Sequence, residues 1–203
     1  MSCNRKNSKI KWYKKNSNLK IIKGDIRDLQ FIESNIKNID VVFHLAALIS
    51  IPHSYQSYNS YIETNIIGTT NILTACKKNN IKKIFVTSTS EVYGSAQKVP
   101  MSEDHSLNAQ SPYAATKIAA DQISISFYKS FNLPVTIIRP FNTFGPRQST
   151  RAIIPTIINQ LFSSKKIKLG NINTIRDFTF ITDTVNGFIS ALKAKKIDGE
   201  VIN

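Results

Sequence analysis

Short apolar runs alternate with longer amphipathic stretches along most of the chain from about Leu19. Each run is nearly continuous in apolar and β-branched residues, as expected of a strand that is covered on both faces. This alternation is typical of βαβ units and predicts an α/β fold with a parallel sheet. The expected strands are Leu19–Ile22, Val41–Leu45, Ile84–Thr87 and Val135–Ile138.

Two long segments between the expected strands have the periodicity of helices, Ser60–Asn79 and Tyr113–Phe131. In the second segment, apolar residues recur at spacings of three and four, which places them on one face of a helix. We expect this stripe to be buried against the sheet. It consists of Ala120, Ile123, Phe127 and Phe131.

The alternation weakens beyond Pro140, where a loop containing Gly and Pro begins. A helix is expected at Ile153–Leu161 and a further short segment around Arg176–Leu192, which together suggest a small lobe. The expected organisation is a basic, poorly structured start at residues 1–18, a sheet domain at residues 19–140 and a lobe at residues 141–203.

The composition is that of a globular chain, since 203 residues that are 41% hydrophobic can bury a sizeable core. Cys3 and Cys76 lie far apart, with no His or Cys beside them at metal-ligand spacing. We therefore expect neither a disulfide framework nor a metal site, and we expect a reducing, cytoplasmic setting. No apolar run approaches the length that crosses a bilayer, so no membrane association is expected.

The formal net charge of +14 attracts polyanions. Much of the excess lies before Asp25, however, and the other lysines are mostly scattered singly. Basic residues do not alternate with aromatic ones in the way that suits stacking on bases. This distribution favours a solvated basic surface over a specific nucleic-acid site, and it is compatible with an anionic substrate.

Tyr113 and Lys117 are four residues apart on an expected helix, which puts the phenol and the ammonium on one face. A tyrosine is a poor base at neutral pH because its reference pKa is about 10. A nearby lysine stabilises the phenolate and lowers that pKa, so that the tyrosine can take a proton from a hydroxyl. Taken alone, the spacing is more typical of a core aromatic residue beside a solvated charge.

A hydroxyl and a carboxylate, Thr89 and Glu91, follow the expected strand Ile84–Thr87. The carboxyl edge of a parallel sheet is where ligands bind in doubly wound folds, so the pair can flank one substrate there. The alternative is a polar turn between strand and loop.

Six segments together resemble the extended short-chain dehydrogenases/reductases of the NAD-dependent epimerase/dehydratase family, which act on nucleotide sugars. They occur in that family's order and spacing from about Gly24 to the end. The resemblance implies a Rossmann-like doubly wound parallel sheet. The segments are Val42–Ala47, Asn65–Thr69, Ser88–Gly94, Ser111–Tyr113 with Lys117, Arg139–Asn142 with Gly145–Arg147, and Arg176–Phe178.

The resemblance also implies a role for each matching residue. Tyr113 would take the proton of the sugar 4-hydroxyl, Lys117 would tune Tyr113 and bind the nicotinamide ribose, and Thr89 would bind the sugar O4. The alternative for Arg176 is a surface salt bridge to a nearby aspartate. The implied NAD-binding residues are Asp25, Ile26, Leu45, Ala46, Ala47, Asn65, Thr87, Tyr113, Lys117 and Pro140, and those for a nucleotide-diphosphate sugar are Thr89, Ser90, Asn142, Arg147 and Arg176.

Glu91 distinguishes the subclasses of the family. In the 4,6-dehydratases, a Glu at this place removes the C5 proton after oxidation at C4, water leaves across C5–C6, and hydride returns to C6. The 4-epimerases usually lack that carboxylate. Ser90 stands where glucose-nucleotide dehydratases have a further acid, so Thr89–Glu91 is more similar to GDP-mannose dehydratases and to the N-acetylglucosamine-nucleotide dehydratases of legionaminate-type pathways. The expected function is a 4,6-dehydratase; the alternatives are a 4-epimerase and an inactive basic binding module.

The sequence contains no Gly-x-Gly-x-x-Gly motif, the loop that holds the cofactor pyrophosphate in relatives. We therefore expect a sheet that lacks its first strand, Gly-rich loop and helix, with part of a small substrate lobe. In that arrangement Leu19–Ile22 has no neighbour and Val41–Leu45 has an open apolar edge. We expect the chain to be incomplete at both ends, with a homodimer as the complete form.

We also expect the chain to bind NAD weakly. Calorimetric titration of this chain beside an N-terminally extended version would check this, and equal, tight binding by both would contradict it.

Overall fold

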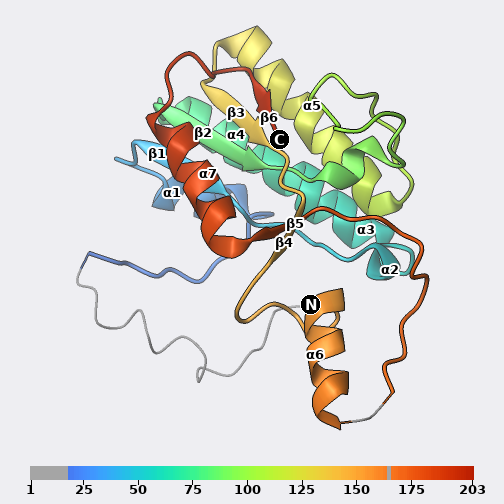
Figure 1. Ribbon diagram of the computed structural model, residues 1–203. Coiled ribbons are helices and arrows are strands. Elements are labelled where there is room, and N and C mark those ends of the chain that lie inside the picture. The colour runs from blue at the N-terminus through green and yellow to red at the C-terminus, as the bar shows by residue number, and fades with distance from the viewer. Residues whose placement is uncertain (1–17, 164–165) are drawn as a thin grey trace.

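The computed structural model describes residues 18–163 and 166–203 (Figure 1). The expected basic start therefore lies outside the described residues, except for Asn18. A parallel sheet of four strands, in the order β1-β2-β3-β6, forms the centre of the fold. Its strands are β1 (Val41–His44), β2 (Lys83–Thr87), β3 (Val135–Ile138) and β6 (Val201–Ile202).

Three of these strands lie where the apolar runs predicted them. All four residues of β3 are buried, and in β2 the three central residues are buried. β2 lies between β1 and β3, with Val42 opposite Ile84 on one side and Val86 opposite Ile137 on the other. Continuous apolar sequence suits these strands because both faces of the sheet are covered.

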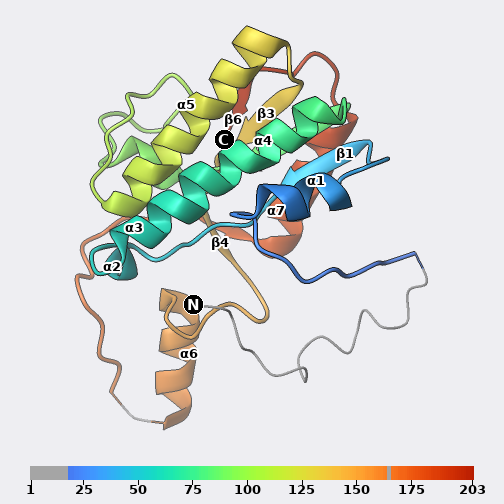
Figure 2. The ribbon, with the colours of Figure 1, turned by 180° about the vertical axis from the view of Figure 1, so that it is seen from behind.

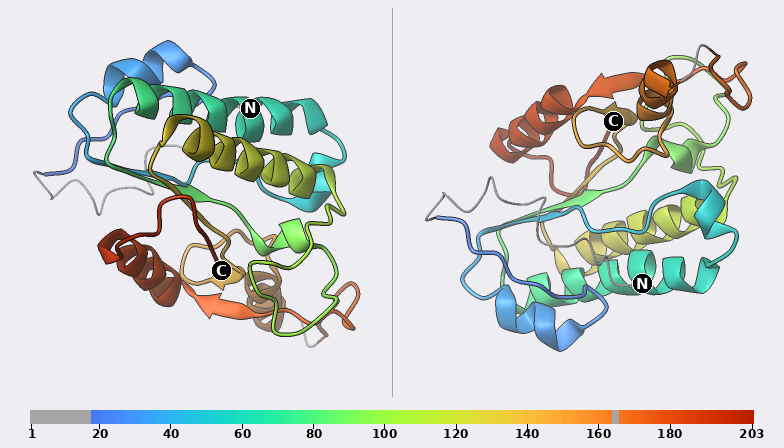
Figure 3. Two further views of the ribbon diagram at one scale, coloured as in Figure 1. Left: turned by 90° about the horizontal axis from the view of Figure 1, so that it is seen from above. Right: turned by 90° about the horizontal axis from the view of Figure 1, so that it is seen from below.

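Helices cover both faces of the sheet (Figures 2 and 3). On one face lie α1 (Leu29–Asn35), α4 (Gly68–Lys78) and α5 (Pro112–Phe131), which pack with β2 and β3 into the larger core cluster. On the other face, α7 (Ile181–Lys193) packs its Ala191 on Phe85 and Ile138. The chain therefore has a three-layer, Rossmann-like α/β fold.

The helical segment predicted at Ser60–Asn79 contains three successive elements. It begins as α3 (Tyr58–Tyr61), continues as the π-helical turn η2 (Ile62–Ile67) and ends as α4. A short helix, α2 (Ile51–Ser54), precedes it. π-helical turns are rare and occur often at functional sites. The turn contains Asn65, whose side chain is buried.

Helix α5 is set by local signals at both ends. The Ser111 hydroxyl accepts a hydrogen bond from the Ala114 amide at 3.1 Å, and Pro112 occupies the first turn. The C-cap Asn132 has a left-handed backbone with φ of 53°. Of the expected apolar stripe, Ala120 is buried and Ile123 and Phe127 are partly buried.

The prediction that Phe131 is buried was wrong. Its side chain is 48% exposed, in the last turn of α5. There the ammonium of Lys77 lies 3.5 Å from the centre of the ring. Cation–π contact with a lysine suits a ring that stays partly in water.

The strand predicted at Leu19–Ile22 does not form. The segment is irregular, with Leu19, Ile21 and Ile22 exposed by 43–54%. Strands are held by hydrogen bonds to a neighbouring strand, and within residues 18–163 and 166–203 β1 pairs only with β2. The prediction of an open apolar edge is thus confirmed, with Phe43 and Leu45 exposed there.

Part of the region beyond residue 140 stands apart from the main sheet, and part of it packs on or pairs with that sheet. β4 (Asn142–Phe144) and β5 (Phe178–Phe180) form a separate parallel pair, and α6 (Ile153–Ser163) projects away from the sheet (Figure 1). α7 packs on the main sheet and β6 pairs within it. Only part of residues 141–203 therefore stands apart from the sheet domain, because the chain returns to β3 at its last residues.

Candidate active site

The turn after β2 carries two of the expected site residues. Thr89 caps the short 3-10 helix η3 (Ser90–Tyr93), and its hydroxyl accepts a hydrogen bond from the Glu91 amide at 3.2 Å. Gly94 ends the helix with φ of 66°, a left-handed conformation that glycine adopts easily. The cap and the glycine together hold Glu91 in a single turn beyond the sheet edge.

Tyr113 and Lys117 lie on the first two turns of α5, both buried. The Lys117 ammonium donates a hydrogen bond to the carbonyl of Thr87 at 2.5 Å. Thr87 is the last residue of β2, so this contact joins α5 to the strand that precedes Thr89 and Glu91. The two chain segments that sequence reasoning picked separately therefore meet at the carboxyl edge of the sheet.

The phenol of Tyr113 interacts with both residues of the turn. Burial raises the pKa of Tyr113 to about 12, a hydrogen bond with Thr89 opposes the rise, and the negative charge of Glu91 adds to it. Glu91 is therefore close enough to Tyr113 for its charge to act on the phenol.

The pKa prediction for Tyr113 had the wrong direction. We expected Lys117 to lower it, but the Lys117 ammonium is directed to the Thr87 carbonyl, and desolvation of the phenol dominates. Burial likewise lowers the pKa of Lys117, while the charge of Asp121 opposes that change.

Tyr61 is an aromatic neighbour of Tyr113 that sequence reasoning missed. Its ring is fully buried and meets the Tyr113 ring edge to face, with 6.2 Å between ring centres. Its one hydroxyl proton is shared between the carbonyl oxygens of Ile49 at 2.6 Å and Ser50 at 2.8 Å. No local motif marks Tyr61, because its role depends on a helix far along the chain.

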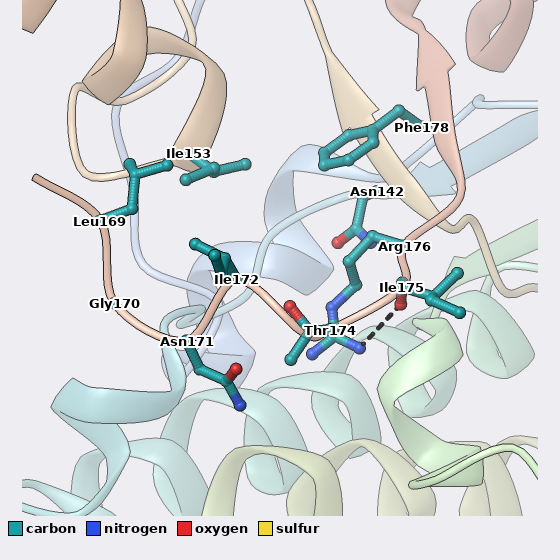
Figure 4. A pocket seen from close by; sticks show the side chains of 10 residues that line it. All are labelled: Asn142, Ile153, Leu169, Gly170, Asn171, Ile172, Thr174, Ile175, Arg176 and Phe178. Atoms are coloured by element: carbon teal, nitrogen blue, oxygen red, sulfur yellow. Dashed lines mark hydrogen bonds between the residues drawn. The ribbon is translucent and has the colours of Figure 1, made fainter. Parts of the chain in front are cut away.

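Glu91 faces a cleft of about 550 Å³ next to η3. The same cleft is lined by Ser90, Asn142 and Arg176. Asn142 and Arg176 also line an adjoining cleft of about 580 Å³, whose other walls are mostly apolar (Figure 4). The structure thus brings four of the residues expected to act on the sugar or its diphosphate to one continuous region.

The guanidinium of Arg176 is available to a ligand. It donates to the backbone carbonyl of Ile175 at 3.4 Å, and within residues 18–163 and 166–203 it makes no ion pair with Asp177 or Asp183. Figure 4 shows its side chain reaching into the cleft beside Asn142. The surface salt bridge considered from the sequence is therefore not formed.

Arg147 lies elsewhere. It lines a separate cleft of about 200 Å³ together with Gly145 and Gln148, and its backbone is left-handed with φ of 70°. The family resemblance grouped Arg147 with Arg176 as a substrate-binding residue, but the cleft that Arg147 lines shares no residue with the cleft that Glu91 and Arg176 line.

Several of the residues expected to bind NAD lie just beyond the carboxyl ends of β1, β2 and β3. Leu45 and Ala46 are exposed directly after β1. Asn65 is buried, and its side chain accepts from the Leu48 amide at 2.8 Å and donates to the Leu48 carbonyl at 3.0 Å. Asn65 therefore holds the loop after β1 in place through both backbone groups of Leu48. The carbonyl of Pro140, after β3, accepts from the Ser90 amide at 3.2 Å.

Asp25 and Ile26 lie beside the start of α4. Ile26 packs against Gly68, at a place where a larger residue than glycine would meet its side chain. A hydrogen bond from Arg27 lowers the pKa of Asp25 to about 2, and Arg27 also pairs with Glu63 at 3.1 Å. Asp25 is exposed but already carries a positive partner.

His44 is a buried histidine that sequence reasoning did not single out. Its Nε2 lies 3.0 Å from the Thr69 hydroxyl, which itself donates to the Asn65 carbonyl at 2.6 Å. The single hydroxyl proton of Thr69 is used in that bond, so Nε2 of His44 is the donor to the Thr69 oxygen. Burial lowers the pKa of His44 to about 4, and the positive charge of Lys117 acts in the same direction.

This lowered pKa predicts acid sensitivity. The folded-state pKa lies below the usual value, so the stabilisation is complete above pH 6.5 and is lost as pH falls toward 4. Between about pH 7 and about pH 4.5 we expect the free energy of unfolding to fall by about 2 kcal/mol through His44 alone. Urea unfolding at both pH values measures it. His44→Asn should lack this component and His53→Asn should keep it; an equal pH dependence of all three chains would contradict the assignment.

Among the described residues, no group of three or more His, Cys, Asp or Glu could hold a metal ion, and no described helix is long and apolar enough to cross a membrane.

A tyrosine and a lysine one helical turn apart, buried at the carboxyl edge of a parallel sheet, define the class of short-chain dehydrogenases/reductases. Within that class, the chain belongs to the GDP-mannose 4,6 dehydratase family, whose family model matches residues 2–203.

Curated relatives include both dehydratases and epimerases. The dTDP-D-glucose 4,6-dehydratase of Dictyostelium discoideum is 36% identical over 93% of this chain and 46% of its own length. The UDP-glucuronate 4-epimerase of Thermodesulfobacterium geofontis is 34% identical over 94% of this chain and 59% of its own length. The chain therefore spans about half the length of the curated relatives it matches.

Solved structures agree on the fold. The UDP-glucuronic acid 4-epimerase of Bacillus cereus, in complex with UDP-glucuronic acid and NAD, matches with a TM-score of 0.87 and 36% identity, over 93% of this chain and 60% of that chain. A dTDP-glucose 4,6-dehydratase of Streptomyces venezuelae with NAD bound matches with a TM-score of 0.87 and 28% identity, over 93% and 59%. These comparisons support the family and do not separate the two reactions.

Proposed function

We propose that the protein acts as an NAD-dependent 4,6-dehydratase of a nucleotide-linked hexose or N-acetylhexosamine. The observation that carries this proposal is the position of Glu91, which lines the cleft shared with Arg176 and acts on the phenol of Tyr113 by its charge. A 4-epimerase needs a proton acceptor at one carbon only. A carboxylate beside the tyrosine gives this site a second acceptor, as elimination across two adjacent carbons requires.

The residues along the sheet edge fit the nicotinamide half of NAD. Leu45 is 64% exposed directly after β1, and the Lys117 ammonium contacts the carbonyl of the last residue of β2. NAD, when bound, would supply the acceptor of a hydride from the substrate and later its donor. NAD in the solved relatives supports this choice. Lys117, Leu45 and Ala46 would hold and orient the cofactor.

Tyr113 would take the proton of the sugar 4-hydroxyl. Its hydrogen bond with Thr89 brings a second hydroxyl to the same place, which would hold the sugar O4 as the C4–O bond becomes a carbonyl. Burial raises the pKa of Tyr113, so a positive charge near the phenol in the reacting complex would favour its action as a base at neutral pH. Lys117, on the next turn of α5, is the residue that can supply it.

Glu91 would then remove the C5 proton, which the neighbouring 4-keto group makes acidic. The electron pair of the broken C5–H bond forms the C5–C6 double bond, and the C6 hydroxyl leaves. Ser90 cannot protonate that leaving group as an acid would, so we assign its proton to Glu91, which has just received one. The proton taken from C5 thereby leaves in the water released at C6. Hydride would then return to C6 and a solvent-derived proton would be added at C5, which closes the cycle.

Arg176 and Asn142 would hold the substrate diphosphate. Arg176 makes no ion pair within the described residues, and a guanidinium forms strong charge-assisted hydrogen bonds with phosphate oxygens. The second cleft continues from these residues, with room for the rest of a nucleotide. Arg147, in its separate cleft, is not part of this proposal, and a homodimer and a cytoplasmic location stay predictions.

The experiment is incubation of the protein with NAD and a panel of nucleotide sugars in deuterated water, followed by mass spectrometry. A dehydratase yields a product that has lost one water and gained deuterium at C5. A 4-epimerase, the second candidate because 4-epimerases match the chain at 34% and 36% identity, yields a product of unchanged composition without deuterium. Epimerised product without dehydration would overturn the proposal.

A further inference from the structure

Helix α5 carries a buried carboxylate one turn beyond Lys117. Asp121 is fully buried, and its Oδ2 accepts hydrogen bonds from the Ser88 hydroxyl at 2.9 Å and from Nε of Arg139 at 3.0 Å. Arg139 is also buried, with 3% of its side chain exposed. Asp121 therefore binds the residue that directly precedes Thr89.

Arg139 extends the network to the other end of η3. Its Nη1 donates to the Tyr93 hydroxyl at 3.0 Å, and its guanidinium lies 5.0 Å from the centre of the Tyr93 ring. The Tyr93 hydroxyl in turn donates to Oδ1 of Asn203 at 2.7 Å. Ser88 before η3 and Tyr93 at its end are thus both connected to one carboxylate.

The network joins the two halves of the site. Thr89 and Glu91 lie between the anchors Ser88 and Tyr93. On α5, Tyr113, Lys117 and Asp121 follow one another at intervals of four residues and share one face. The distance between the Tyr113 phenol and the Glu91 carboxylate therefore depends on the hydrogen bonds that connect Asp121 to the two ends of η3.

The network is a poor way to stabilise a core. Oδ1 of Asp121 has no hydrogen-bond partner among the described residues, although it is buried. A buried ion pair costs desolvation of both charges, and apolar residues of similar size often serve stability as well or better. Buried polar groups that do not favour stability are expected where function requires them.

We propose that Asp121 is a positioning residue, which through Ser88, Arg139 and Tyr93 fixes the helix that carries Glu91 against the helix that carries Tyr113 and Lys117. The effect of this positioning on catalysis rests on the proposed function. The connection between the two helices does not depend on the proposed function.

Amide hydrogen exchange of the 203-residue chain tests the connection directly. Tyr93→Phe removes only the hydroxyl and keeps the buried ring, and Asp121→Asn removes the charge that holds Arg139. We expect both to speed exchange of residues 89–94 by about tenfold, because η3 opens locally, while exchange in β3 stays unchanged. Ser124→Ala is the matched control, since among the described residues its buried hydroxyl bonds within α5, to the Ala120 carbonyl at 2.8 Å.

Two outcomes would overturn the proposal. One is exchange at residues 89–94 that is unchanged in Tyr93→Phe. The other is a rise shared equally by β3, which would mark a residue that merely stabilises the whole fold. Because Asp121→Asn leaves Arg139 buried without its partner and can unfold the chain, Tyr93→Phe alone is sufficient for the decision.

A kinetic experiment tests the consequence for catalysis. It compares two rates in a single turnover, the rate of deuterium uptake at C5 and the rate of hydride transfer from C4. Tyr93→Phe is expected to lower the first by about tenfold more than the second, because it loosens Glu91 and leaves Tyr113 in place. An unchanged ratio in an active enzyme would overturn the positioning role. If the protein converts no nucleotide sugar at all, the proposed function fails, and the exchange measurement still decides the connection.

Discussion

Glu91→Gln is expected to slow removal of the C5 proton by about 10²–10⁴-fold, the usual contribution of a positioned proton acceptor. Gln keeps the shape of the side chain and cannot accept the proton. Oxidation at C4 should continue, because that step depends on Tyr113 and Thr89. The expected result is a reduced cofactor that retains the hydride, together with a 4-keto sugar that does not proceed to product.

Absorbance of the reduced cofactor in a single turnover measures the first step, and deuterium at C5 measures the second. Glu33→Gln is the matched control, since Glu33 lies on α1 and pairs with Lys78 at 2.7 Å, away from the cleft. Equal slowing of both steps by Glu91→Gln would mean that Glu91 only supports the fold of the turn. Unchanged deuterium uptake would remove it from the mechanism.

Tyr113→Phe is expected to lower hydride transfer from C4 by about 10²–10⁴-fold, because the phenol is the proposed acceptor of the 4-hydroxyl proton. The phenyl ring fills the same space, and the variant no longer has to desolvate a phenol hydroxyl beside the negative charge of Glu91. Its free energy of unfolding should therefore equal or slightly exceed that of the parent chain, which separates a catalytic loss from an unfolding loss.

Single-turnover absorbance and urea unfolding together check this prediction. Tyr128→Phe, on the same helix but partly exposed, is the matched control and should change neither quantity. A Tyr113→Phe variant that transfers hydride at the parent rate would contradict the assignment of the base, whatever its stability.

The sequence alone determined the elements whose signals are local. β1, β2 and β3 form at their apolar runs because a strand covered on both faces needs no other pattern. Helix α5 begins at Pro112 because Ser111 caps it, and it puts Tyr113 and Lys117 on one face by its own periodicity. Thr89 and Glu91 were expected at the carboxyl edge of the sheet because they follow a parallel strand, whereas only the family resemblance placed Tyr113 and Lys117 in the same site.

The tertiary structure decided everything that depends on a distant neighbour. Leu19–Ile22 has the composition of a strand, but it forms none without hydrogen bonds from another strand. β6 joins the sheet because β3 offers it a partner, although the two are far apart along the chain. Neither outcome can be read from local patterns.

The electrostatics of the site also required the folded chain. The spacing of Tyr113 and Lys117 predicted a lowered phenol pKa, whereas burial raises it and the ammonium binds the Thr87 carbonyl. The link from Asp121 to Tyr93 joins residues from α5, β3 and η3 that no sequence window contains. Desolvation and long-range pairing depend on what surrounds a group in three dimensions. The sequence therefore determined which ionisable residues the site contains, and the fold determined their pKa values and their partners.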